Sequence, residues 1–331
     1  MRSFHINSFG GPDSLIIKES ELPKPGRGEV LVRVRASSLN FRDLIIFAGQ
    51  YQPLIEIGRV PLSDGAGEIE ALGEGVKRFR VGDKVVNCFL PNWFGGTLNT
   101  PPEQWVIDHD GWLTEYKVVN AESLVPMPSH MSFEEGATLS CAAVTAWSAL
   151  AGVRAGDLVL TQGTGGVSLF AVQLAVALGA RVISTTSSHE KAEMLRRLGA
   201  HDVINYNATP EWGDAVRELT NGRGVDRVVE VGGPATLPQS MKASAIGAEI
   251  SIVGILAGYE GGVDFMTMFR SRVGFRAVTV GSRRDLEDMC RAMEQHGIRP
   301  VIDSVHAFDD AKTANTHFGA RNVVGKVVIE H

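Results

Sequence analysis

The chain has 331 residues, of which 44% are hydrophobic and 21% charged, the composition of a folded globular protein long enough for two domains. Its formal net charge of −6 at pH 7, with no run of lysine or arginine, excludes a general nucleic-acid surface and an anionic-membrane patch. The three cysteines form no disulfide framework, the N-terminus lacks a signal-peptide core, and no apolar run spans a bilayer, so we expect a cytoplasmic protein.

The first third of the chain predicts short antiparallel strands. Residues 29–35 alternate apolar and charged side chains, as a half-exposed strand does. Further short β segments, 68–72 and 84–87, are separated by glycine turns. This pattern predicts a compact β-barrel rather than βαβ units.

The central part of the chain changes to a strand, a glycine turn and a helix. Residues 158–160 form the strand, the turn runs over 162–166, and an apolar helix continues until Gly179. Glycines in such a turn let backbone N–H groups at the helix N-terminus approach a diphosphate. The second strand, at 181–185, completes the context of a dinucleotide-binding fingerprint.

The same alternation continues downstream. We expect helices at 190–198 and 211–219 and strands at 202–205, 225–231, 248–253 and 275–280. Strands and helices that alternate in this way predict an α/β fold with a doubly wound parallel sheet. A helix at 285–296 and a strand at 324–329 could finish either domain.

These motifs in this order resemble the medium-chain dehydrogenase/reductase superfamily, in particular its zinc-lacking, quinone-oxidoreductase-like branch. The resemblance covers nearly the whole chain and rests on the glycine turn and on five further segments: 38–43 (SLNFRD), 64–68 (DGAGE), 81–85 (VGDKV), 141–147 (CAAVTAW) and 325–328 (GKVV). It implies a GroES-like β-barrel catalytic domain (1–124 and 283–331), a Rossmann domain (125–282) and an active site in the cleft. It also implies a small-molecule substrate and a homodimer joined at the Rossmann sheet edge.

The resemblance also shows which metal ligands are missing. Zinc-dependent members bind catalytic zinc through a Cys where this chain has Asn40, a His where it has Ser63, and a Cys that matches Cys141. One thiolate does not make a tetrahedral zinc site, so we expect no metal. Reduction of a quinone or a conjugated C=C places negative charge on an oxygen that hydrogen bonds can stabilise, so conjugated carbonyls become the favoured substrates.

The second strand of the dinucleotide-binding unit ends in Thr-Thr-Ser-Ser, with no carboxylate before Glu190. An acidic residue there would select NAD, so its absence favours NADPH over NADH. In quinone-oxidoreductase relatives a Ser, a Lys and a Tyr contact the 2′-phosphate, and the matching residues are Ser187, Lys191 and Tyr206. Alternatively, the serines only cap the next helix and Lys191 is solvated.

Further cofactor contacts are expected from residues near the glycine turn and from matches to relatives: Asn40, Thr145, Gly163, Thr164, Gly165, Gly166, Val167, Thr186, Gly254 and Arg321. Relatives often carry glycine where this chain has Ser168, and we expect a slightly shifted helix there.

Two residues are candidates for catalysis. The resemblance places Asn40 near nicotinamide and substrate, where its amide could orient a carbonyl, although asparagine at this point is often only a turn residue. Tyr51 falls where enoyl reductases place a proton-donating tyrosine, and is equally well explained as a loop anchor. The aromatic segment 89–115 forms a substrate wall or covers its own barrel.

Together these features predict an NADPH-dependent reductase of quinones or α,β-unsaturated carbonyls that works without metal. Two alternatives stay open. One is an NAD(P)-dependent alcohol dehydrogenase, against which the missing ligands argue. The other is a protein that binds the cofactor without turnover.

Overall fold

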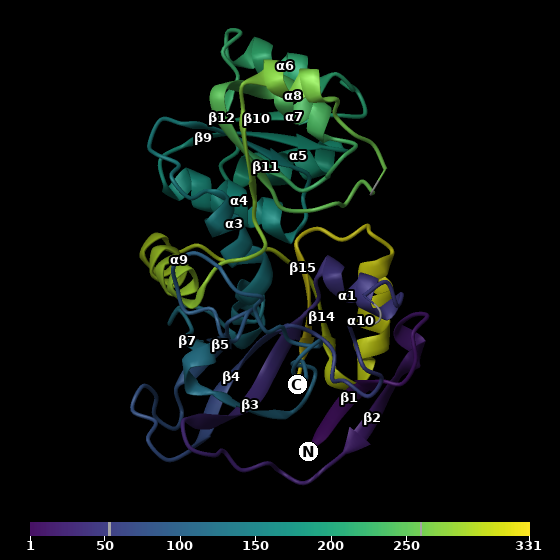
Figure 1. Ribbon diagram of the computed structural model, residues 1–331, viewed down its shortest axis with the longest axis vertical. Helices are drawn as coiled ribbons and strands as arrows, with labels where there is room; N and C mark the ends of the chain where they lie inside the picture. The colour runs from purple at the N-terminus through teal and green to yellow at the C-terminus, as the bar shows by residue number, and fades with distance from the viewer. Residues whose placement is uncertain (52–53, 259) are drawn as a thin grey trace. The chain divides into compact units, whose positions relative to one another are not determined.

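A computed structural model describes residues 1–51, 54–258 and 260–331 (Figure 1). The chain forms two compact units: unit 1 comprises Met1–Val144 and Val280–His331, and unit 2 comprises Thr145–Thr279. Residues 125–144, which the sequence assigns to the dinucleotide-binding domain, lie in unit 1, where β7 (Leu124–Pro126) pairs with β5 (Lys84–Asn87). No helix in the described ranges has the length and hydropathy needed to cross a membrane.

Unit 1 is built around one long strand, β3 (Glu29–Ser38), whose Val30, Val32 and Val34 are buried. The alternation in the sequence explains this burial, because every second side chain of a strand faces the same side. The strand has three antiparallel partners, β4 (Asp64–Leu72), β6 (Tyr116–Asn120) and β15 (Lys326–Glu330). At one end of this sheet β14 (Ile302–Ala307) pairs in parallel with β15, and at the other end lie β5 and β7. A separate antiparallel pair consists of β1 (Arg2–Ile6) and β2 (Leu15–Glu19).

The helices of unit 1 are α1 (Phe41–Phe47), α2 (Phe133–Gly136), α9 (Arg283–His296) and α10 (Ala311–Gly319), with a π-helical turn at Leu139–Ala143 and 3₁₀ turns at Pro12–Ser14, Ala121–Ser123 and Phe308–Asp310. Residues Val280–His331 lie in unit 1 together with Met1–Val144. The sequence did not predict α1, α10 or β14.

The aromatic segment of unit 1 packs into its own core. Trp105 and Trp112 are buried and meet edge to face, with ring centroids 5.7 Å apart. A Cβ atom at Gly65 would lie only 2.4 Å from Trp112 Cε3, so this close approach requires glycine. For these two tryptophans the covering role is confirmed, whereas Phe94 is exposed.

Unit 2 contains a six-stranded sheet in which all neighbouring strands are parallel. The order is β10-β9-β8-β11-β12-β13, which is the 3-2-1-4-5-6 order of a dinucleotide-binding Rossmann fold. The strands are β8 (Leu158–Gln162), β9 (Arg181–Thr186), β10 (Asp202–Asn205), β11 (Val225–Glu230), β12 (Ser244–Ile252) and β13 (Gly274–Ala277). The order reverses between β8 and β11, and ligands of such sheets bind beyond the carboxyl ends of the strands at this reversal.

Five helices follow these strands in unit 2: α4 (Gly166–Ala177), α5 (His189–Arg197), α6 (Trp212–Leu219), α7 (Leu237–Ala243) and α8 (Phe265–Ser271); α3 (Val144–Ala149) precedes them. The apolar α4 is buried nearly all round, which its sequence predicted. The last predicted strand, 275–280, is shorter than expected, since β13 ends at Ala277. The sequence did not predict α7 or α8.

Candidate functional site

The glycine turn lies between β8 and α4 at the carboxyl edge of the unit 2 sheet. Gly163 has φ +73°, which favours glycine, and its N–H donates to Thr185 O at 2.7 Å. Gly165 is the N-cap of the twelve-residue α4. A Cβ atom built at either glycine would meet no atom within 4 Å. The backbone is therefore open to a ligand where the helix N-terminus attracts an anion, which fits a dinucleotide diphosphate.

Two buried hydroxyls among the predicted cofactor residues lack hydrogen-bond partners in the described part of the chain. They are Thr145 Oγ1 and Thr186 Oγ1, the second at the end of β9. A buried hydroxyl without a partner costs free energy, so such a group is suited to a bound ligand. Gly254, after β12, passes so close to Val231, the residue after β11, that a Cβ there would lie 2.8 Å from Val231 O.

The three residues expected to bind a 2′-phosphate follow β9 and β10. Tyr206 is partly exposed, and its N–H donates to Thr186 O at 2.9 Å, while Asn207 Nδ2 donates to Ser187 O at 2.9 Å. The two loops are therefore tied together. The serine that caps α5 is Ser188, whose Oγ accepts the N–H of Lys191 at 3.3 Å, so Ser187 is not used as the cap.

In unit 1, Asn40 is held at the start of α1 by a lysine from the last strand. Its side chain is buried, and its Oδ1 accepts a hydrogen bond from Lys326 Nζ at 2.6 Å. The same ammonium donates to Leu39 O at 2.5 Å and lies 3.8 Å from Asp64 Oδ2. Because an ammonium only donates, this contact fixes the orientation of the Asn40 amide. Sequence analysis missed Lys326, although a lone lysine in the apolar run 323–329 was the available signal.

The residues at the zinc-ligand positions do not form a metal-binding donor set. The Asn40 oxygen is bound to Lys326, and Ser63 Oγ donates to Asp64 Oδ1 at 3.4 Å. Burial raises the pKa of the Cys141 thiol, which disfavours the thiolate that zinc requires. Within the described ranges no group of three or more His, Cys, Asp or Glu side chains is arranged to hold a metal ion.

The buried carboxyls beside Lys326 have displaced pKa values. Burial raises the pKa of Asp43 to about 7, although Arg42 and the N–H of Asn40, which donates to Asp43 Oδ2 at 2.8 Å, oppose the shift. Burial also raises the pKa of Asp64, against the charge of Lys326 and hydrogen bonds from its neighbours. The cluster therefore combines two desolvated carboxyls with one fixed ammonium.

The other predicted residues of unit 1 lie on the surface of its core. Tyr51 is partly buried against the core, with the guanidinium carbon of Arg42 5.6 Å from its ring centre. Arg42 also donates to Trp105 O at 2.9 Å. Arg321 places its guanidinium carbon 5.5 Å from the ring centre of Phe41, the residue after Asn40.

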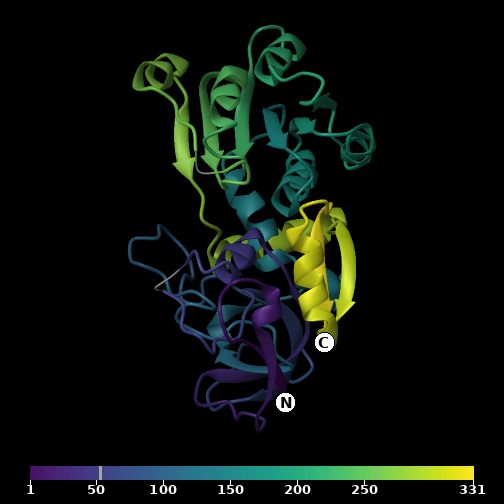
Figure 2. The same cartoon turned by 90° about the vertical axis from the view of Figure 1, so that its right-hand side faces the viewer.

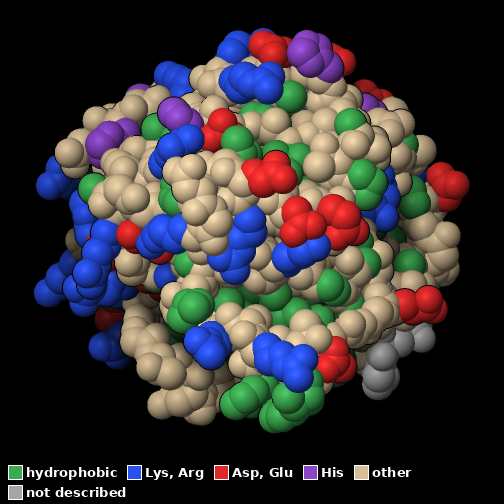
Figure 3. Space-filling view, turned by 90° about the horizontal axis from the view of Figure 1, so that it is seen from above, with side chains coloured by type: hydrophobic (Ala, Val, Ile, Leu, Met, Phe, Trp, Pro, Cys, Tyr) green, Lys and Arg blue, Asp and Glu red, His purple; other side chains and the backbone are tan. Residues whose placement is uncertain are grey.

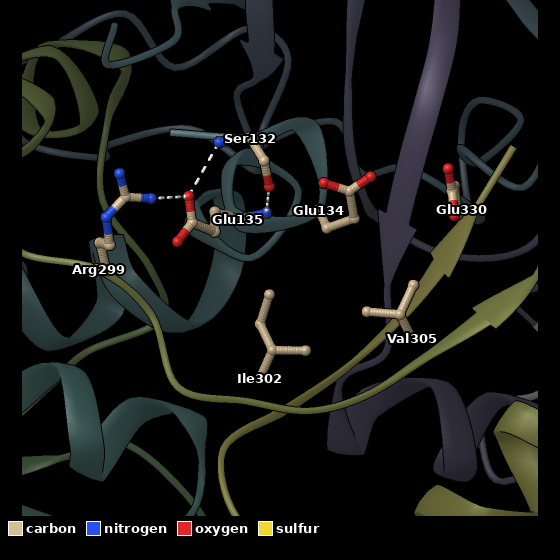
Figure 4. Close-up of a pocket in the computed structure, with 7 residues that line it drawn as sticks. All are labelled: Ser132, Glu134, Glu135, Arg299, Ile302, Val305 and Glu330. Atoms are coloured by element: carbon tan, nitrogen blue, oxygen red, sulfur yellow. Dashed lines mark hydrogen bonds and ion pairs between the residues drawn. The ribbon is translucent and has the colours of Figure 1, made fainter. Parts of the chain in front are cut away.

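One hollow of unit 1 is lined by none of the predicted site residues. It has a volume of about 510 Å³ and is lined by the residues shown in Figure 4: Ser132, Glu134, Glu135, Arg299, Ile302, Val305 and Glu330. Glu135 closes a capping box with Ser132 and pairs with Arg299 at 2.5 Å. Ser132, Glu135 and Arg299 therefore bind one another.

A Rossmann sheet with an open glycine turn, joined in one chain to a GroES-like antiparallel sheet, defines a nicotinamide-dependent oxidoreductase. Residues 26–129 match the alcohol dehydrogenase GroES-like domain family, and residues 166–295 match the zinc-binding dehydrogenase family. The chain belongs to the medium-chain dehydrogenase/reductase superfamily. The predicted superfamily and fold class are thereby confirmed.

Two relatives and two solved structures illustrate this similarity. A zinc-type alcohol dehydrogenase-like protein of Schizosaccharomyces pombe is 42% identical (98% of this chain, 97% of the relative), and a quinone oxidoreductase of Pseudomonas aeruginosa is 32% identical (97% of each). The structure of an NAD-dependent alcohol dehydrogenase matches this chain with a TM-score of 0.93 and 33% sequence identity. The structure of a mycobacterial protein in complex with NADPH matches it with a TM-score of 0.84 and 28% sequence identity. Each structural match covers 100% of both chains.

The raised pKa of Asp43 predicts how stability depends on pH. A folded-state pKa of about 7, above the ordinary value of 3.8, means that the stability contributed by this carboxyl is complete below pH 3.8 and is lost as the pH rises through about 7. Asp43→Asn keeps an oxygen that accepts the N–H of Asn40 and removes this loss. The melting temperature of the variant, relative to that of wild type, should therefore be higher at about pH 8 than at about pH 5.

Glu74→Gln, which changes an exposed carboxylate of the same unit, is the control and should show no such difference. A stability difference between Asp43→Asn and wild type that is constant with pH would contradict the assignment.

Proposed function

We propose that this chain is an NADPH-dependent oxidoreductase that transfers a hydride to a quinone or an α,β-unsaturated carbonyl without a metal. The observation that carries the proposal is the contact between Lys326 Nζ and Asn40 Oδ1, at the position where zinc-dependent members hold their metal. Oxidation of a simple alcohol needs a Lewis acid for the alkoxide, whereas a conjugated acceptor needs only hydrogen-bond donors. The quinone oxidoreductase relative supports the same substrate class.

In this proposal, unit 2 binds the cofactor. The glycine turn and the N-terminus of α4 would hold the diphosphate through Gly163, Thr164, Gly165, Gly166 and Val167. Further contacts to the cofactor would come from the free hydroxyls of Thr145 and Thr186, from Gly254 and from Arg321. When bound, the nicotinamide supplies the hydride.

In this proposal, residues of unit 1 bind the substrate. Because Asn40 Oδ1 accepts from Lys326, its NH₂ group remains as a donor, to Asp64 or to a substrate carbonyl oxygen. We propose that this NH₂ group stabilises the negative charge that develops on the oxygen. Tyr51 would then supply the proton to the carbon, for which its partly buried position near Arg42 is suited.

Two assays test the proposal: consumption of NADPH with a panel of quinones, enones and aldehydes, and formation of NADPH from NADP⁺ with simple alcohols. We expect turnover with quinones or enones that a zinc chelator leaves unchanged. Tyr51→Phe should lower kcat for enones by about 100-fold, since general acid catalysis contributes on that order, and should affect quinones less.

Chelator-sensitive alcohol oxidation would instead identify an alcohol dehydrogenase. A shift of NADPH fluorescence on binding, with no turnover of any compound, would identify a cofactor-binding protein. Unchanged turnover of every enone by a folded Tyr51→Phe variant would remove the proton-donor role.

We propose NADPH as the cofactor because no carboxylate occupies the end of β9, where Ser187 and Lys191 are available to a phosphate. The mycobacterial NADPH complex supports this preference, and the NAD-dependent structure represents the alternative.

Lys191→Ala should raise the Kd for NADPH about tenfold, the loss of one charge-assisted contact, and leave that for NADH unchanged. Arg196→Ala, on the same helix but paired with Glu193, serves as the control. Equal effects of Lys191→Ala on both cofactors would refute the 2′-phosphate contact.

We also propose a homodimer formed at the edge of unit 2, where β13 ends the sheet (Figure 2). The preceding helix, α8, leaves Phe265 and Phe269 76% and 69% exposed, with their rings stacked 6.3 Å apart. Exposed apolar groups of this size are typical of interfaces. Other hydrophobic side chains also reach the surface on the face shown in Figure 3.

Light scattering coupled to size exclusion should give a dimer for wild type and a monomer for Phe269→Glu. Phe94→Glu, which changes an exposed phenylalanine of unit 1, should remain dimeric. A monomeric wild-type protein would contradict the proposal.

We propose a cytoplasmic location on the basis of the free cysteines. Cys88, Cys141 and Cys290 form no disulfide in the described chain, and burial raises the pKa of each thiol. Fractionation of cells that produce the protein tests this location, and recovery from a secreted or membrane fraction would contradict it.

A further inference from the structure

A buried carboxylate, Glu230, lies at the carboxyl end of β11 and is satisfied entirely by neutral donors. Its side chain is only 1% exposed, and no lysine or arginine of the described ranges pairs with it. One oxygen accepts from Gly232 N at 2.8 Å, Gly233 N at 2.9 Å and Thr236 Oγ1 at 2.6 Å. The other accepts from Gln162 Nε2 at 2.8 Å and from Ser240 Oγ. Five donors offset much of the cost of burying a charge.

Gln162 connects this carboxylate to the glycine turn. It is the last residue of β8 and directly precedes Gly163. Its Oε1 accepts from Val231 N and Gly232 N at 3.2 and 3.3 Å, and its backbone oxygen accepts from Ser168 Oγ at 2.6 Å. Glu230 and Gln162 therefore link the end of β8, the first turn of α4 and the loop after β11.

The loop after β11 supports a second loop that carries a predicted cofactor residue. Val231 O and Gly232 O accept from Leu256 N at 3.0 Å and Ala257 N at 2.9 Å. Gly233, at φ +90°, lies so close to this loop that a Cβ there would be 3.0 Å from Ile255 Cα. The position of residues 253–257, including Gly254, thus depends on the loop that Glu230 fixes.

This network lies at the reversal of strand order. β8 and β11 are neighbours in the sheet, and the chain winds in opposite directions on either side of them. In doubly wound sheets this is where a dinucleotide crosses the carboxyl ends of the strands. Since Glu230 already holds the N–H groups of Gly232 and Gly233, it acts on a ligand only through the backbone that it orients.

We propose that Glu230 is a positioning residue for the dinucleotide, which fixes the loops on both sides of the strand reversal before the cofactor binds. This inference rests on the proposed cofactor function. The network supports the diphosphate and nicotinamide part of the ligand. Within the described residues, the hydrogen-bond partners of Glu230 are Gln162, Gly232, Gly233, Thr236 and Ser240, and they do not include the residues that are proposed to bind the adenosine 2′-phosphate.

The test compares NADPH with 2′,5′-ADP, which lacks the nicotinamide half, by calorimetric titration of Glu230→Gln. The amide keeps the shape of the carboxylate but presents an NH₂ group to neighbouring donors. We expect the Kd for NADPH to rise about tenfold or more, from the loss of hydrogen bonds to a charged acceptor, and that for 2′,5′-ADP to change less than about twofold.

The matched control is Glu249→Gln, which removes a carboxylate of β12 that pairs with Arg227 and Arg276 in the same unit. It should lower the melting temperature without changing either Kd. If Glu230→Gln does not fold, Thr236→Val removes a single donor to the same oxygen and should raise the Kd for NADPH about threefold.

Equal affinities of the folded variants and wild type for NADPH would overturn the positioning role, as would equal losses for NADPH and 2′,5′-ADP. If wild type binds NADH in place of NADPH, the cofactor preference fails, and the same comparison of NADH with AMP decides the role of Glu230. Failure of wild type to bind either dinucleotide would overturn the proposed function, and this inference with it.

Discussion

The ammonium group of Lys326 is the interaction on which the candidate substrate site depends. It is 3% exposed and joins three segments: the start of α1 through Leu39 and Asn40, the start of β4 through Asp64, and its own strand β15. Loss of this cation would leave a fully buried carboxylate without its partner, which typically costs several kcal/mol. The cation that holds Asn40 and Asp64 is thus a side chain of the chain's last strand.

Unit 2 satisfies its buried charge in the opposite way. Glu230 is surrounded by N–H and O–H donors from its own loop, from β8 and from α7, and its charge is distributed over five hydrogen bonds. Both arrangements make local backbone geometry depend on one ionised group. Such networks favour one conformation strongly, because a partly satisfied charge in a low-dielectric interior is expensive.

The sequence predicted those features whose cause is local. The glycine turn, the buried α4 and the alternating strands of unit 2 follow from residues close together in the chain, and the structure has them within a few positions. The contact between Asn40 and Lys326 joins residues far apart in the chain, so no spacing rule could reveal it. The same limit applies to Trp105 and Trp112, whose burial became evident only from the packing of Trp112 against Gly65 and of Trp105 against Trp112. Helix α8 escaped prediction because its large apolar side chains face outward.

The division of the chain has a consequence for synthesis on the ribosome. Unit 2 is one continuous stretch, Thr145–Thr279, whereas unit 1 needs β15 to pair with β3 across most of the chain. Domains fold as units as they emerge from the ribosome. Unit 2, which begins later in the chain, can therefore be complete while unit 1 still lacks β15. Until β15 is made, Asp64 has no cation, and the nascent antiparallel sheet exposes the edge of β3 that β15 later covers.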